Sequence, residues 1–252
     1  MFHVSAEVLA LLMAAAFVAG FVDSIAGGGA LITVPVLLLA GADPVTALAT
    51  NKLQGLFGAG SAAINYARSG HVSLKRQVTP ALIAFAAAIA GALLTTRLPT
   101  DLIRLGLPVL LIAIALFFAF KPGLTDTDRA RRITPAVFAL TLVPLIGFYD
   151  GLIGPGAGAF YMLGFVTLAG YGVLKATAHT KLLNFASNLG GILAFALVAM
   201  PWWTTGLAMG AAQVAGATVG SRVAMRVGAN VIKPVLVITS TALALCLIWQ
   251  MI

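Results

Sequence analysis

Two segments of this chain are copies of one another, and this duplication limits the possible folds more than any other feature. Residues 20–32 read GFVDSIAGGGALI and residues 147–160 read GFYDGLIGPGAGAF. Asp23 thus matches Asp150, and a run of glycines follows each acid. Two further pairs of segments match in the same order: 49–53 with 178–182, and 91–97 with 216–222. The chain is therefore predicted to contain two related units, each about half its length.

The composition indicates that these units lie in a membrane. The chain is 61% hydrophobic and 9% charged, and its mean hydropathy is +1.06. A water-soluble protein of this composition would expose far more apolar surface than monomers tolerate. The net charge of +8 does not indicate nucleic-acid binding, because the basic residues are spread over short loops between apolar segments. The lipid bilayer is therefore an expected partner, and nucleic acid is not.

Apolar segments, and the residues that interrupt them, divide each unit into five elements. They are expected at 7–22, 30–40, 45–67, 78–97 and 102–120, and again at 135–149, 159–170, 173–199, 205–224 and 231–251. The last three of each unit are long enough to cross a bilayer, whereas the first two are short for it. Each short pair is therefore predicted to form a broken, re-entrant hairpin whose tip lies inside the protein.

The predicted fold is an all-α integral membrane protein with two inverted-topology repeats, each a hairpin plus three transmembrane helices. The repeats cover residues 1–120 and 135–252, and the charge-rich segment 121–134 links them. The Lys and Arg residues of loop 68–76, of this linker and of loop 222–233 can all be cytoplasmic at once. Both termini are then outside, and the two repeats enter the membrane from opposite sides. A homodimer is expected for a symmetric membrane protein of this size.

Two lysines inside apolar segments are the strongest indication of a binding site. Lys52 and Lys181 occupy matching positions, and inverted repeats bring both toward the middle of the bilayer. A charge there costs about 2.5–3.5 kcal/mol. One interpretation is that the two ammonium groups face each other across a cavity that admits an anion. The alternative is that each lysine snorkels, or forms a structural ion pair with Asp23 or Asp150.

The glycine runs and the polar residues near the lysines fit an anion site. If helices begin near Ala30 and Ala159, their N-termini supply free N–H groups and the positive end of the helix dipole. Glycine also permits a close approach of the backbone to a ligand. The expected substrate-binding residues besides the lysines are Gly28, Gly29, Gly156, Gly158, Asn51, Gln54, Thr180 and Asn184. Asn65 and Asn188 are weaker candidates, and His179 is an expected cavity-lining residue; hydrogen bonds between helices explain such polar residues equally well.

Two roles remain open for the two acids that precede the glycines. Asp23 and Asp150 either stabilise the hairpin tips or carry protons that couple transport to a pH gradient. The three histidines are too scattered in the sequence for a metal site, and no cofactor is expected. The acids also raise the rival hypothesis of an intramembrane di-aspartyl protease. A protease does not need a lysine in each repeat, so this hypothesis is less favoured.

Together these segments resemble a known family. GFVDSIAGGGALITVPVLLLAG followed by ATNKLQG, and GFYDGLIGPGAGAF followed by AHTKLLNFASN, are similar to the paired signatures of the sulfite exporter TauE/SafE family of bacterial permeases. The resemblance covers essentially the whole chain. It implies a secondary transporter, not an enzyme, that exports or imports small sulfur-containing anions such as sulfite or organosulfonates across the bacterial inner membrane, with export the favoured direction. A passive anion channel is the closest alternative.

Overall fold

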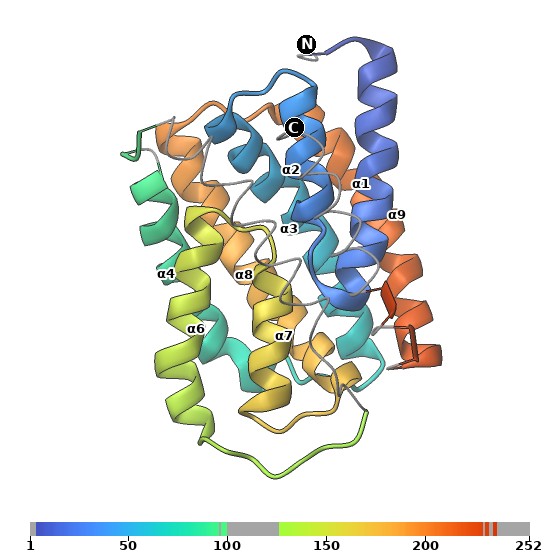
Figure 1. Cartoon of the computed structure of the whole chain (residues 1–252), viewed down its shortest axis with the longest axis vertical. Helices are drawn as coiled ribbons and strands as arrows, with labels where there is room; N and C mark the ends of the chain where they lie inside the picture. The colour runs from blue at the N-terminus through green and yellow to red at the C-terminus, as the bar shows by residue number, and fades with distance from the viewer. Residues whose placement is uncertain (1–3, 96, 100–125, 229, 232–233, 236–252) are drawn as a thin grey trace, which may run out of the picture.

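The computed structural model describes residues 4–95, 97–99, 126–228, 230–231 and 234–235. Within these residues the chain is helical and contains no strand, as predicted (Figure 1). The helices of the first half are α1 (Ala6–Ala26), α2 (Ala30–Leu39), α3 (Pro44–Arg68), the 3-10 turn η1 (Lys75–Gln77) and α4 (Val78–Thr95). Those of the second half are α6 (Pro135–Leu152), α7 (Ala157–Thr167), α8 (Val173–Val198) and α9 (Trp203–Val227). The element predicted at 102–120, and nearly all of that at 231–251, lie outside the described residues.

The first helix of each hairpin is longer than predicted. The helix α1 has 21 residues and α6 has 18, and both are long and apolar enough to cross a membrane. The prediction that neither is long enough was wrong, because each helix continues past its acid before glycine ends it. Asp23 and Asp150 can lie inside a helix because each is paired with a lysine. The helix α1 ends at Gly27, and α6 ends just before Gly154. Both glycines have positive φ angles, which glycine adopts readily.

The second helix of each hairpin is short, with 10 residues in α2 and 11 in α7. The helix α2 begins at Ala30, as predicted, whereas α7 begins at Ala157, two residues earlier than predicted. The glycine-rich tips between the paired helices are buried inside the protein, as predicted. The tips also touch each other: a Cβ on Gly27 would lie 2.6 Å from the backbone of Gly158.

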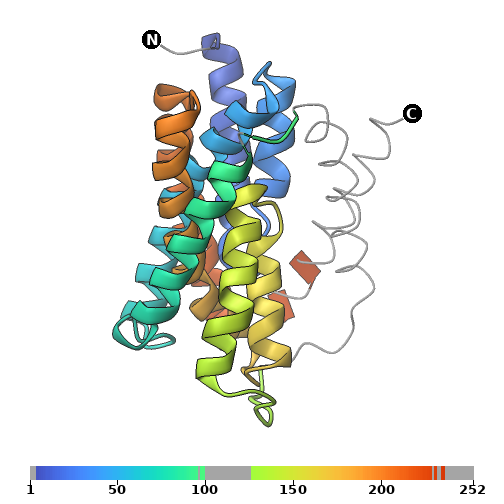
Figure 2. The same cartoon turned by 90° about the vertical axis from the view of Figure 1, so that its left-hand side faces the viewer.

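Each hairpin packs against a helix from the other half of the chain. The helix α1 lies along α9, and α6 lies along α4 (Figures 1 and 2). Between these two pairs, α3 packs against α9, α8 packs against α4, and α3 and α8 pack against each other. Small residues permit these contacts, since a Cβ on Gly216 would overlap the Phe17 carbonyl and one on Gly151 would overlap that of Ala88. In Figure 1 the α1–α2 hairpin opens upward and the α6–α7 hairpin opens downward. The inverted topology in a membrane stays a prediction.

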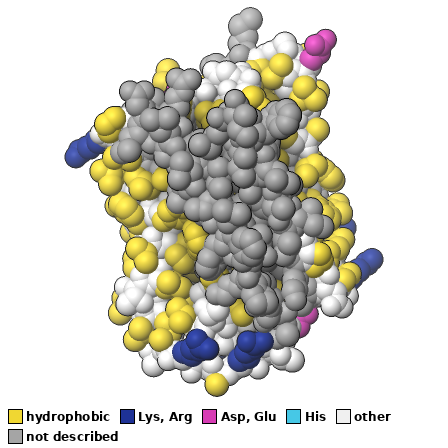
Figure 3. Space-filling view, viewed as in Figure 1, with side chains coloured by type: hydrophobic (Ala, Val, Ile, Leu, Met, Phe, Trp, Pro, Cys, Tyr) yellow, Lys and Arg dark blue, Asp and Glu magenta, His cyan; other side chains and the backbone are white. Residues whose placement is uncertain are grey.

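The outer surface is suited to lipid. Large apolar side chains such as Leu39, Leu140 and Leu197 are exposed, and Figure 3 shows hydrophobic side chains along the flanks of the molecule. Lys75–Thr95 and α8 also meet the length and hydropathy of a membrane span. The helices α3 and α9 have 25 residues each and are therefore long enough to cross, as predicted, but their hydropathy is below that of the four described helices that qualify as spans. The protein is an integral membrane protein in which α3 and α9 pack against other helices of the same chain.

Candidate functional site

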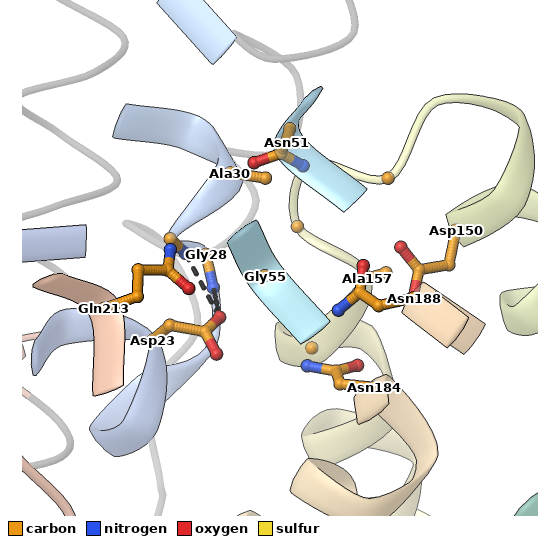
Figure 4. A pocket seen from close by; sticks show the side chains of 14 residues that line it. Asp23, Gly28, Ala30, Asn51, Gly55, Asp150, Ala157, Asn184, Asn188 and Gln213 are labelled. Atoms are coloured by element: carbon orange, nitrogen blue, oxygen red, sulfur yellow. Dashed lines mark hydrogen bonds between the residues drawn. The ribbon is translucent and has the colours of Figure 1, made fainter. Parts of the chain in front are cut away.

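A small cavity lies where the two hairpin tips meet, and helices of both halves enclose it (Figure 4). Its volume of about 30 Å³ holds one or two water molecules. The tips contribute Asp23, Gly28, Gly29 and Ala30 on one side, and Asp150, Gly154, Gly156, Ala157 and Gly158 on the other. The helices α3, α8 and α9 contribute Asn51, Gly55, Asn184, Asn188 and Gln213. The cavity is therefore built from both repeats.

Each buried lysine pairs with the acid of the other repeat. The Lys52 Nζ on α3 donates to Asp150 Oδ1 on α6, and the Lys181 Nζ on α8 lies 3.0 Å from Asp23 Oδ2 on α1. Neither lysine side chain is more than 1% exposed. Neither lysine lines the cavity; each is paired with an acid that does, and the part of the lysines in anion binding stays a prediction. The sequence had left ion pairing open as the alternative, and that is the arrangement in the structure.

The two acids are held in different ways. Asp23 accepts hydrogen bonds at Oδ1 from the backbone N–H groups of Gly28 and Gly29, at 3.1 and 3.2 Å. Its carboxylate thus stabilises the N-terminus of α2, where a negative charge is favoured. Asp150 instead accepts from Ser187 Oγ on α8 in addition to Lys52. Asp23 therefore fits the predicted role of stabilising a hairpin tip, and Asp150 joins α6 to α3 and α8.

The N-terminus of α7 faces the cavity without a side-chain cap. Its N-cap residue Gly156 adopts a left-handed conformation with φ 83°, and no side chain accepts from the first turn. Ser5, Asp43 and Thr134 cap α1, α3 and α6, whereas α8 and α9, like α7, begin without a side-chain cap. The first backbone N–H groups of a helix need acceptors, and here the cavity supplies the space for one.

Amide side chains complete the wall of the cavity. The Asn51 Oδ1 already accepts from Thr33 Oγ1 at 2.7 Å and from Gln54 Nε2 at 3.1 Å. Because the oxygen is engaged, the Asn51 amide nitrogen remains available as a donor toward the cavity. Asn184 is 6% exposed, and its Oδ1 is buried without a hydrogen-bond partner in the described part of the chain. An unsatisfied buried amide oxygen is costly, so a hydrogen-bond donor such as a bound water is its expected partner.

The structure places the predicted site residues in three groups. The four predicted glycines, both acids, Asn51, Asn184 and the weaker candidate Asn188 line the cavity. Lys52, Lys181, Gln54 and Thr180 are buried but do not line it. His179 lies in a different cavity, and Asn65 donates to Ser221 Oγ on α9 at 3.0 Å, so hydrogen bonding between helices explains it.

Several residues of the site and its support, Ala157 among them, were missed from the sequence. Gln213 on α9 and Gly55 on α3 line the cavity, and Ser187 holds Asp150. Only Gln213 had a usable signal, since it is a single amide within the small-residue segment GAAQVAGA. Gly55 and Ser187 resemble ordinary packing residues of membrane helices.

The arrangement does not match a di-aspartyl protease. In such a site two carboxylates share a proton, whereas here each binds its own lysine and no hydrogen bond joins them within the described residues. No group of three or more His, Cys, Asp and Glu side chains suited to a metal ion occurs in that part of the chain either. The chemistry available at this cavity is that of charge pairs, helix N-termini and amides.

Comparisons with known proteins agree on one family. Residues 12–247 match the sulfite exporter TauE/SafE family. The chain is 60% identical to the probable membrane transporter protein ORF9 of a Sinorhizobium species, over 96% of this chain and 93% of that protein. It is 45% identical to the probable membrane transporter protein YfcA of Escherichia coli K12, over 99% of this chain and 93% of that protein. No solved structure matches. The chain is a membrane transporter that belongs to the sulfite exporter TauE/SafE family.

Proposed function

We propose that the protein exports a small sulfur-containing anion, such as sulfite or an organosulfonate, across the bacterial inner membrane. The anion binds in the central cavity between the hairpin tips. One observation carries the proposal: the cavity joins the uncapped N-terminus of α7 to amides of three helices, with a buried lysine–aspartate pair on each side. Backbone N–H groups and amides are suitable donors for an oxyanion. The sulfur chemistry comes from the family to which the chain belongs.

The charges around the cavity link the anion to a proton. Each ammonium group is neutralised by a carboxylate, so the two pairs leave no net charge to offset a bound anion. Two carboxylates that line the cavity would repel the anion across a medium of low dielectric constant. Uptake of a proton by Asp23 or Asp150 removes that repulsion and releases a lysine charge. We therefore propose that the anion and a proton bind together.

A carrier fits the cavity better than the alternative of a passive channel. A channel needs a continuous path, whereas this cavity holds only one or two water molecules and the tips meet at Gly27 and Gly158. Movement of one tip away from the other would open the cavity to one side at a time. The homodimer predicted from the sequence stays a prediction.

Transport measurements on protein reconstituted in liposomes test this function. Sulfite efflux is expected to saturate, at a rate well below about 10³ per second, which a channel would exceed; rates in enzyme-like cycles are usually about 1–10³ per second. Asn184→Ala is expected to raise the half-saturating sulfite concentration about tenfold, since it removes a cavity amide. Asn65→Ala is the matched control, because this amide lies outside the cavity. If neither sulfite, sulfoacetate nor taurine is transported, the proposed substrate class is wrong.

The proposed orientation predicts which loops each side of the membrane exposes. Thr127 lies in the linker and Thr204 near the start of α9, and both are exposed. In a variant without Cys246, cysteines at these two positions are expected to react with impermeant reagents from opposite sides, with position 127 cytoplasmic. Labelling of both from one side would contradict the inverted repeats.

A further inference from the structure

A second and larger cavity lies at the linker end of the protein, and the transport site does not use it. Its volume is about 460 Å³, which is within the usual range for binding sites of small organic ligands. Its walls come from the loop after α3, from η1 and the linker, from the starts of α4, α6 and α8, and from the end of α7 with the loop that follows it. In Figure 3 Lys and Arg side chains lie at this lower end of the molecule, and others lie at its upper left and at its right edge.

Basic side chains dominate the charge of this cavity. Arg76, Arg131 and Lys175 line it, together with two imidazoles, and no acidic side chain lines it. Lys175 is offset by Asp128, at 2.6 Å, and hydrogen bonds from Lys175 and from the Gly172 N–H lower the pKa of Asp128. Neither guanidinium group forms an ion pair within the described residues. Two unpaired arginines in one concave site favour an anion, and phosphate matches their planar donor geometry.

A buried amide in the same cavity also lacks a partner. Gln77 lines the cavity, is only 6% exposed, and its Oε1 has no hydrogen bond in the described part of the chain. Leaving such a group unsatisfied is costly. Rotation of the amide by half a turn presents either its oxygen or its NH₂ group to a ligand. This observation is independent of the arginines and indicates a ligand in the cavity itself.

An aromatic wall faces the charged side chains. The Phe165 ring stacks on that of Phe138 at 4.6 Å and on that of Tyr171 at 5.5 Å. The His179 ring contacts Tyr171 edge-on at 4.8 Å, and Lys175 Nζ lies 4.3 Å from the centre of the Tyr171 ring. Such a wall accommodates an apolar or planar group attached to the anion.

The cavity lies on the opposite face of α8 from the transport site. Lys175 and His179, four residues apart, share one face and line the large cavity, whereas Asn184 and Asn188 line the central one. From Lys175 to Asn184 the helix turns by about 900°, or two and a half turns, so the two residues lie on opposite faces of α8. The body of α8 therefore separates the two cavities.

We infer that this cavity is a second ligand site, which binds a phosphate-bearing anion with an apolar or planar group. Arg76 and Arg131 bind the phosphate, Gln77 hydrogen-bonds to the ligand, and the aromatic wall contacts its remaining part. The same chemistry is present in a soluble organic phosphate and in the headgroup region of an anionic phospholipid. The inference does not depend on the proposed transport function.

Binding to the purified full-length protein tests the site. The probes are ADP as the soluble phosphate, dioctanoyl phosphatidylglycerol as the lipid, and adenosine as the control without phosphate. We expect ADP or the lipid to bind, adenosine not to bind, and the double variant Arg76→Gln/Arg131→Gln to lose at least tenfold in affinity. Binding of ADP alone assigns a soluble ligand, and binding of the lipid alone assigns a membrane source.

Two further variants separate the cavity from a basic surface. Arg226→Gln removes an exposed charge of the same kind on α9, outside the cavity, and is expected to bind the probe normally. Gln77→Met keeps the shape of the side chain, so the protein is expected to fold and to melt at the same temperature or higher while its affinity falls. No binding of either phosphate probe, an equal loss in Arg226→Gln, or normal affinity in Gln77→Met would overturn the proposal.

Discussion

Lys52→Met is expected to destabilise the protein by about 3–5 kcal/mol and to abolish transport. The variant leaves the Asp150 carboxylate buried without a counter-charge, and breaking a buried ion pair at one partner is much more costly than removing both. The double variant Lys52→Met/Asp150→Asn is therefore expected to recover most of the stability, but not transport. Denaturant titration of the purified protein in detergent measures the first effect, and flux from liposomes measures the second.

Lys175→Met is the matched control for this experiment. Lys175 also pairs with an acid, Asp128, but the two side chains are 43% and 53% exposed. Solvent screens such a pair, so the variant is expected to lose less than about 1 kcal/mol. If Lys52→Met is no less stable than Lys175→Met, the buried pair does not contribute to stability as proposed. The matching variant Lys181→Met is expected to behave like Lys52→Met, because it leaves Asp23 unpaired.

The affinity for the anion is expected to rise as the pH falls, and Asp→Asn variants are expected to remove this dependence. If one proton binds together with the anion, the affinity rises by up to about tenfold for each unit by which the pH falls. Asparagine has the shape of a protonated aspartate but does not titrate. One of the variants Asp23→Asn and Asp150→Asn removes the proton carrier. At neutral pH that variant is expected to bind the anion with the affinity that the native protein has at low pH. Titration calorimetry between pH 5 and 8 measures the slope.

The alternative role of the two acids leads to the opposite result. If Asp23 and Asp150 only hold the tips and the lysines, their Asn variants should lose stability and binding together. The anion flux through the remaining folded protein should then keep its response to a pH gradient. Asp43→Asn controls for the substitution itself, because Asp43 caps α3 at the surface and asparagine caps a helix equally well.

The hairpins were predictable because local features of the sequence produce them. Glycine runs with positive φ end α1 and α6, and α2 begins at Ala30 as expected. The repeated motif identified both tips and the acid of each, and the structure places both acids in the cavity wall. The lengths of α1 and α6 were not predictable, since a helix passes through an acid at this depth only if a distant lysine neutralises it.

The partners of the two lysines show what the sequence alone left undecided. It identified Lys52 and Lys181 as costly charges in an apolar environment, but pairing and anion binding both reduce that cost. The choice depends on how the two halves pack, because each lysine binds the acid of the opposite repeat. Residues so distant in the sequence meet only through tertiary contacts, and no periodicity within one helix indicates them.

The sequence by itself determined the environment, the duplication, the hairpins and the family. All of these follow from composition, from local backbone preferences and from motifs within short segments. Only the tertiary structure decided that the carboxylates, rather than the ammonium groups, face the central cavity, that Gln213 joins them, and that Gln77 and the arginines surround a second cavity. The physical reason is that a cavity exists only between packed elements, so its lining depends on distances that a linear sequence does not contain.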